Sequence, residues 1–166
     1  MKQIKGQILG EAIVAMGLIT IGVLGMTGFL ARSISEGRSI ADQTIASNLA
    51  AEGIEITKNI LDGNALDGGG SWNEGFTSEG FFEVDFRDTE LEPEGPQGLR
   101  FLRKEEIGDA QFYSYTGGVN TTFRRSIEIR RGASDHHIRV TARVYWVARE
   151  GRLNQVTISS DFYNWR

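Results

Sequence analysis

The sequence predicts an α+β protein in which a long N-terminal α-helix packs against a C-terminal antiparallel β-sheet. The first third of the chain keeps a helical spacing of apolar residues, and no proline occurs before Pro93. The last third alternates apolar and polar residues, which is typical of strands with one buried face. A chain of 166 residues, 40% hydrophobic and 24% charged, suits one modest domain plus an additional segment.

Residues 8–31 form an apolar run whose one charged residue is Glu11. At about 1.5 Å per residue, a helix of this length spans roughly 36 Å, enough to cross a bilayer. Lys2 and Lys5 precede the run, so we expect the N-terminus in the cytoplasm and the C-terminal domain outside it. The run is longer than the apolar core of a cleaved secretory signal. The sequence therefore predicts a single-pass membrane segment that is retained.

The start of this run carries a more specific pattern. Lys5 and Gly6 end a short basic leader, Gln7 follows, and Glu11 is the fifth residue after Gly6. This pattern resembles the class III signal of type IV prepilins and type II secretion pseudopilins. The resemblance implies that prepilin peptidase cuts between Gly6 and Gln7 and N-methylates Gln7. The family usually has Phe at the first mature position, where this chain has Gln7.

Glu11 requires a positive partner, because a carboxylate in apolar surroundings is costly. In the family the new amino terminus supplies that charge during assembly, so the resemblance implies pairing of Glu11 with the amine of Gln7 on a neighbouring subunit. The implied partners are prepilin peptidase, other pilin or pseudopilin subunits, the pilus or secretion assembly platform, and the membrane. The implied location is the inner (cell) membrane and, after assembly, the pilus or pseudopilus.

An alternative interpretation is a non-polymerising, single-pass membrane-anchored module that binds a ligand outside the cytoplasm. It explains the length of the apolar run but gives Glu11 no role. The two interpretations differ in the mature N-terminus, which is Gln7 in the first and Met1 in the second.

The helical spacing continues beyond Arg32, and Gly63 suits a helix stop. The segment 46–55 is similar to the corresponding stretch of V-type minor pilins and I-type pseudopilins. The residues expected on one apolar face are Leu30, Ile34, Ala41, Ile45, Leu49, Ile56 and Ile60.

The chain is therefore expected to have four parts in a pilin-like arrangement. They are a leader peptide (1–6), a transmembrane or filament-core half of the helix (7–31), an amphipathic half (32–62) and a β-rich head (63–166) with glycine-rich and acidic loops.

The glycine-rich loop after the helix contains three candidate calcium ligands, Asp62, Asn64 and Asp67. Their spacing misses the EF-hand pattern, and no glutamate stands at the offset of the bidentate ligand. We therefore predict a connector here, and no metal or other cofactor.

Several strands are expected in the head. Residues 82, 84 and 86 would point inward, with Glu83 and Asp85 on the solvent side. Residues 87–98 are predicted to be an exposed acidic loop. Further strands are expected near 99–103, 111–115, 123–130, 138–148 and 156–162, with a turn at 150–152.

The composition argues against catalysis. The chain has no cysteine and two histidines, which lie in the surface motif Asp135-His136-His137 and are expected to form a turn. We predict no enzymatic activity. A formal charge of -4, which becomes more negative when the lysines of the leader are removed, argues against DNA binding. Arginines nevertheless crowd the strand region and are expected on a solvated sheet face: Arg124, Arg125, Arg130, Arg131, Arg139 and Arg143.

Overall fold

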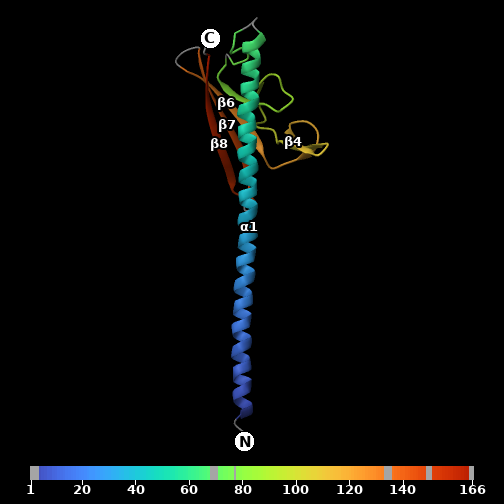
Figure 1. Cartoon of the computed structure of the whole chain (residues 1–166), viewed down its shortest axis with the longest axis vertical. Helices are drawn as coiled ribbons and strands as arrows, with labels where there is room; N and C mark the ends of the chain where they lie inside the picture. Colours follow the sequence, from blue (N-terminus) through green and yellow to red (C-terminus); the bar gives the residue numbers. More distant parts are fainter. Residues whose placement is uncertain (1–3, 68–70, 77, 133–135, 149–150, 165–166) are drawn as a thin grey trace. The chain divides into compact units, whose positions relative to one another are not determined.

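The computed structural model describes residues 4–67, 71–76, 78–132, 136–148 and 151–164. The chain divides into two units, Met1–Ala41 and Asp42–Arg166, and the division falls within helix α1 (Ile4–Asp67). The described strands all belong to the second unit (Figure 1). We call this unit the head from here on; unlike the predicted head (63–166), it includes residues 42–67 of α1. One long apolar N-terminal helix followed by antiparallel sheets confirms the α+β class.

Helix α1 ends at Asp67 rather than at the predicted Asp62. Gly63 was expected to stop the helix, but it keeps a helical backbone instead of a positive φ. Contacts within the head hold the last turns, since Leu61 is buried and the Asn64 amide donates a hydrogen bond to the Glu74 carbonyl at 2.7 Å. The predicted glycine-rich loop therefore begins later than expected.

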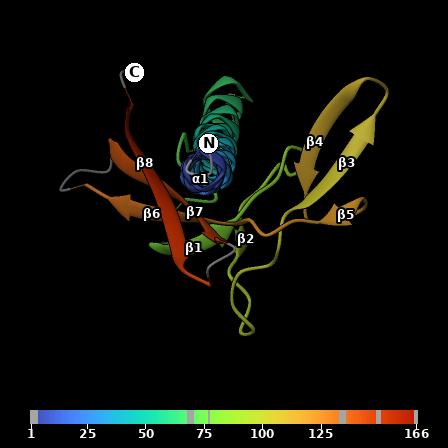
Figure 2. The same ribbon diagram turned by 90° about the horizontal axis from the view of Figure 1, so that it is seen from below.

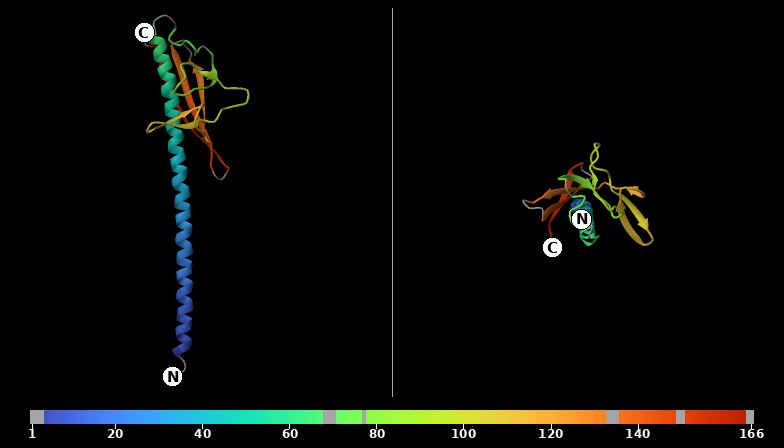
Figure 3. Two further views of the ribbon diagram at one scale, coloured as in Figure 1. Left: turned by 90° about the vertical axis from the view of Figure 1, so that its right-hand side faces the viewer. Right: turned by 90° about the horizontal axis from the view of Figure 1, so that it is seen from above.

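The main sheet has five antiparallel strands in the order β2-β1-β6-β7-β8. It lies beside the part of α1 that belongs to the head (Figure 3). The three predicted C-terminal strands are confirmed as β6, β7 and β8, and Gly151 (φ 76°) lies in the turn between the last two. The strands are β1 (Gly80–Glu83), β2 (Glu92–Pro93), β6 (Arg124–Arg131), β7 (His137–Val147) and β8 (Leu153–Tyr163).

A smaller antiparallel sheet has the order β4-β3-β5, with β3 at Arg103–Ile107, β4 at Ala110–Ser114 and β5 at Val119–Asn120. A strand was predicted at 99–103, but β3 begins at Arg103, so this strand lies further along the chain than expected. Gly108 takes φ 64° in the two-residue turn between β3 and β4, a conformation that favours glycine.

The helix and the main sheet enclose the core of the head. Figure 2 shows the part of α1 that belongs to the head over one face of that sheet. Leu49 and Ala50 of α1 are buried, and the core residues on the strands include Ile127 of β6 and Val140 of β7. The approach is closest at Gly53, where an added Cβ atom would lie 2.8 Å from Ile127 Cδ1.

The buried stripe of α1 is centred differently from the predicted face. Ile45 and Ile60 are only partly buried, and Leu30 and Ile34 are exposed. Small residues explain the shift, because they carry little hydrophobic signal in the sequence but let the sheet approach the helix closely. The fully buried stripe consists of Ala46, Ala50, Gly53, Thr57 and Leu61, together with Leu49.

Candidate functional site

The apolar segment 8–31 is exposed on all sides of α1 in the isolated chain. Its large hydrophobic side chains are 54% to 73% exposed, with Val23 and Phe29 at the two limits. By length and composition, this is a helix that can cross a membrane. An apolar surface around the whole circumference of a helix requires cover, either from lipid or from other helices.

Glu11 interrupts this apolar surface near its start. It lines a shallow concavity with Gly10, Val14, Ala15 and Leu18. Among the described residues, Glu11 makes no hydrogen bond or ion pair. Two small residues therefore flank a carboxylate that lacks a partner within the described chain, and a neighbouring helix could approach it closely.

The predicted processing site lies at the first residues of the described chain. The backbone of Lys5, Gly6 and Gln7 belongs to α1, whereas Lys2 lies outside the described residues. Gln7 and Glu11 are four residues apart on one helix, so the two positions share a face.

The structure does not bring the candidate calcium ligands Asp62 and Asn64 together. Asp62 and Asn64 both lie on α1, two residues apart, so their side chains leave the helix in different directions. Asp62 lies 3.8 Å from the Lys58 amine, and the Asn64 amide is bonded to the Glu74 carbonyl. The side chain of Asp67 lies outside the described residues, and the described part of the chain holds no cluster of three or more acidic, histidine or cysteine side chains suited to a metal.

The predicted surface turn is confirmed at His136, which lies in a turn and is exposed, whereas His137 belongs to a strand. His137 begins β7, its Nε2 lies 2.7 Å from Asp161 Oδ1, and its ring stacks on Tyr163 with centroids 4.5 Å apart. His136 is exposed, and Asp135 lies outside the described residues.

The arginines of the strands are largely engaged by carboxylates. Arg130 and Arg143 both contact Glu128, at 2.5 and 2.6 Å. Burial by itself would raise the pKa of Glu128, but these two guanidinium groups outweigh it and lower the pKa. Arg139 makes two hydrogen bonds to Asp161. The outer face of the sheet is therefore a set of ion pairs rather than an open basic surface.

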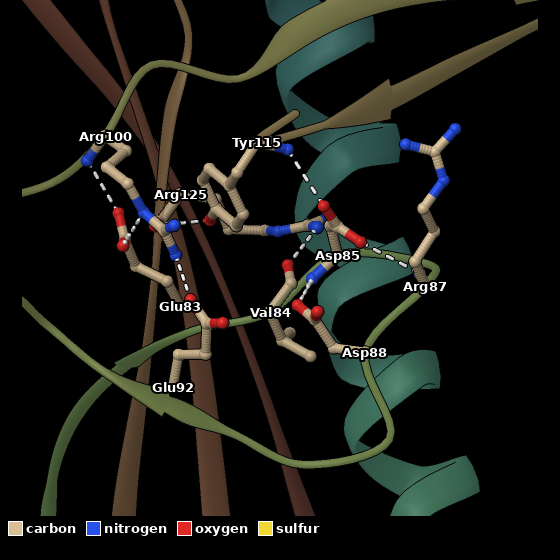
Figure 4. A network of polar contacts seen from close by, with 9 residues as sticks. All are labelled: Glu83, Val84, Asp85, Arg87, Asp88, Glu92, Arg100, Tyr115 and Arg125. Atoms are coloured by element: carbon tan, nitrogen blue, oxygen red, sulfur yellow. Dashed lines mark hydrogen bonds and ion pairs between the residues drawn. The ribbon is translucent and has the colours of Figure 1, made fainter. Parts of the chain in front are cut away.

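Arg125 departs most from expectation, because its side chain is fully buried instead of solvated. Its Nη1 donates to the Leu49 carbonyl at 2.9 Å and lies 3.3 Å from Glu52 Oε1. Its Nη2 donates to the Val84 carbonyl, while Nε has no partner among the described residues. A single guanidinium thus joins α1, β6 and the segment after β1 (Figure 4).

Glu83 and Asp85 were also predicted on the solvent side, and both are buried. The Glu83 carboxylate accepts hydrogen bonds from the backbone N–H and the Nε of Arg100, both at 2.6 Å. Asp85 accepts from the backbone N–H groups of Arg87 and Tyr115, at 2.8 Å each. The predicted alternation fails here because β1 ends at Glu83, and the two carboxylates bind the segments that follow.

The buried side chains of Glu83, Asp85 and Arg125, together with Arg100, form a polar cluster. Tyr115 directly follows β4 and packs against this cluster. Its hydroxyl lies 3.4 Å from the Arg125 carbonyl oxygen, and the Arg100 guanidinium stacks 4.4 Å from its ring centroid. Burial raises the pKa of Tyr115 to about 12. The polar cluster connects the two sheets, and no part of it is arranged as a nucleophile and base.

One of these misplaced residues had a signal in the sequence. Arg125 is an even number of residues away from Phe123, Ile127 and Ile129, so alternation along the strand places its side chain on the same inward face. Glu83, Asp85 and Arg100 had no such signal, because their pairing depends on where the chain turns after β1.

Comparison of the chain with protein-family models, with curated proteins and with solved structures found no match.

Proposed function

We propose that this protein is a structural subunit, a minor pilin or pseudopilin, of a type IV pilus or a type II secretion pseudopilus. The proposal includes cleavage after Gly6 and N-methylation of Gln7 by prepilin peptidase. The observation that carries it is Glu11, a charged residue on a helix surface that is otherwise apolar from Ile8 to Ala31 and exposed throughout.

The physical argument concerns what can cover this segment. In the membrane, lipid covers the apolar side chains, but a carboxylate within them costs free energy unless it is paired. Cleavage after Gly6 would create a positive amine at Gln7, close to the level of Glu11 on a parallel neighbour. Neighbouring helices would then replace lipid around the apolar surface while the ion pair sets their axial register.

The head contributes a stable body rather than a catalytic site. Several of its carboxylates and guanidinium groups form pairs that join separate segments of the head, as at Arg125 and Glu83. We expect no enzymatic activity from this protein, and its partners are the peptidase, the other subunits and the assembly platform in the membrane.

Mass spectrometry of the mature N-terminus tests the processing step. We expect a chain that starts at methylated Gln7 when the protein is produced with its cognate peptidase, and an uncut chain in a Gly6→Val variant. A mature chain that keeps Met1 would instead support the non-polymerising membrane anchor.

A second experiment tests the role of Glu11. Glu11→Ala should lower the amount of the protein in sheared filaments by about tenfold or more, since the loss of a charge pair of 1.4 kcal/mol already changes an equilibrium tenfold. Glu36→Ala is the matched control, because Glu36 is an exposed acid on the same helix that pairs with Arg32 at 2.9 Å. Equal incorporation of both variants would refute the proposed role.

A further inference from the structure

Strand β8 is a long, open edge of the main sheet. It has 11 residues and ends the strand order, so its backbone pairs with β7 on one side only. Within residues 154–162, the backbone hydrogen bonds of the described chain run to β7 alone. The other side of this backbone presents a row of unpaired N–H and C=O groups.

Strand β8 has few of the residues that usually protect an edge strand. Leu153–Tyr163 contains no proline, glycine, lysine or arginine, and its one charge is Asp161. The opposite edge of the same sheet is well protected, because β2 has two residues, Glu92 and Pro93. The contrast shows that one edge is closed to further strands and the other is open.

The side chains along β8 specify what an added strand must carry. Val156, Ile158 and Phe162 pack against the core yet are only half-buried. An incoming strand that places apolar side chains beside them would complete their burial. On the outer face, Asp161 bonds to Arg139 and His137, which lower its pKa to about 2. It therefore remains ionised and favours a basic residue opposite it.

A cavity lies at the C-terminal end of this edge. It has a volume of about 380 Å³ and is lined by Lys58 and Asp62 of α1 and by Trp72, which follows the helix. From β8 it is lined by both Asp161, on the outer face, and Phe162, on the inner face. Residues of both faces of β8 line it, so the cavity lies beside the end of the strand.

We propose that the free edge of β8 is a docking site for an extended segment of another polypeptide, which joins the main sheet as an additional strand. Alternate residues of that segment are apolar, and the residue opposite Asp161 is basic. The inference is independent of the filament assignment, because both the edge and its test concern the head.

A second β8 strand does not fit as the occupant. Leu153–Tyr163 contains no lysine or arginine, so antiparallel pairing of two β8 strands would leave Asp161 without a basic residue opposite it. A segment of another polypeptide can supply that residue.

The test uses the full chain in detergent micelles and a fluorescent probe peptide, acetyl-Thr-Val-Lys-Val-Thr-Val-Thr-Val-Thr-amide. In antiparallel register its lysine faces Asp161 and its valines face the inner row of β8. The control peptide has the same composition, with its valines adjacent so that the alternation is lost. We expect the probe peptide, and not the control peptide, to bind saturably. Binding of the probe should also increase the protection of amides 154–162 from hydrogen exchange.

Two variants separate edge pairing from general charge effects. Ser160→Lys places a charge in the inner row, which an added strand must cover, and should weaken probe binding by about tenfold or more. Gln155→Lys adds the same charge on the outer row and should change the affinity by less than about threefold. Thermal unfolding establishes that both variants fold; if Ser160→Lys does not, the two peptides on the unsubstituted chain decide.

Three results would overturn the proposal. They are equal binding of the two peptides, protection of amides outside β8 without protection of 154–162, and equal affinities of Ser160→Lys and the unsubstituted chain. A dimer that forms without peptide and is abolished by Ser160→Lys would assign the edge to a second copy and would also contradict the proposal.

Discussion

The close contact at Gly53 leads to a quantitative prediction about the helix–sheet interface. An added Cβ atom at this position would lie 2.8 Å from Ile127 Cδ1 and 2.9 Å from Arg125 Cδ. Ile127 is fully buried, and Arg125 is held by its hydrogen bonds to Leu49 and Val84, so neither side chain can move away freely. Gly53→Ala should therefore force α1 and β6 apart.

Two opposing effects determine how much Gly53→Ala changes the free energy of unfolding. Alanine in place of glycine stabilises a helix interior by about 1 kcal/mol. Overpacking of a close-packed core costs about 1–3 kcal/mol. We expect Gly53→Ala to lower the free energy of unfolding by up to about 2 kcal/mol.

Gly63→Ala is the matched control, because Gly63 lies in the same helix and an added Cβ would meet no atom within 4 Å. This variant should raise the free energy of unfolding by up to about 1 kcal/mol. Urea unfolding of the full chain in micelles measures both changes, followed by the fluorescence of buried Trp146. If Gly53→Ala stabilises the protein as much as Gly63→Ala does, the interface is not as tight as described.

Three further predictions concern the polar groups of the head. Arg125→Ala should lower the free energy of unfolding by about 3–5 kcal/mol, because two buried carbonyl groups lose their hydrogen-bond donor and a cavity remains where the side chain was. A loss below about 1 kcal/mol in urea unfolding would contradict this. The pKa of Asp161 lies at about 2, below its ordinary 3.8, through its hydrogen bonds to Arg139 and His137. Its contribution to stability is therefore present above about pH 4 and lost as the pH falls from about 4 to about 2. Thermal melts of Asp161→Asn should show a flatter dependence in that window, and a curve parallel to that of the unsubstituted chain would refute the assignment. The pKa of Tyr115 is raised to about 12 by burial, so its stabilising effect is full below about pH 10 and is lost as the pH rises through about 12; ultraviolet titration should show a late tyrosinate transition that Tyr115→Phe removes.

The elements with strict periodicity were the ones that the sequence predicted well. The alternation in 123–130, 138–148 and 156–162 corresponds to β6, β7 and β8, and the turn at Gly151 lies between the last two. Short strands were less predictable, since β3 was displaced and the two-residue β2 was not foreseen. A strand of two residues has no period, and its position depends on its partner β1.

The polar residues were predicted less well than the apolar ones. Arg125 was placed in solvent because of its charge, and Glu83 and Asp85 because they alternate with apolar residues, yet all three are buried. Each is accommodated by a partner distant in the sequence: Arg125 meets Leu49, 76 residues away, Glu83 meets Arg100, 17 residues away, and Asp85 meets Tyr115, 30 residues away. Burial of a charge is decided by such partners, and composition does not reveal them.

The sequence by itself determined the apolar N-terminal helix and the position of Glu11 within it, because length, hydropathy and spacing along the chain are local properties. It also determined the antiparallel character of the head, through the alternation along its strands. The tertiary structure alone decided that α1 runs past Gly63 to Asp67, that small residues form its buried stripe, and that β8 is left as an open edge. These features depend on which distant segments meet, since contacts across the core outweigh local propensity and only strand order reveals an edge.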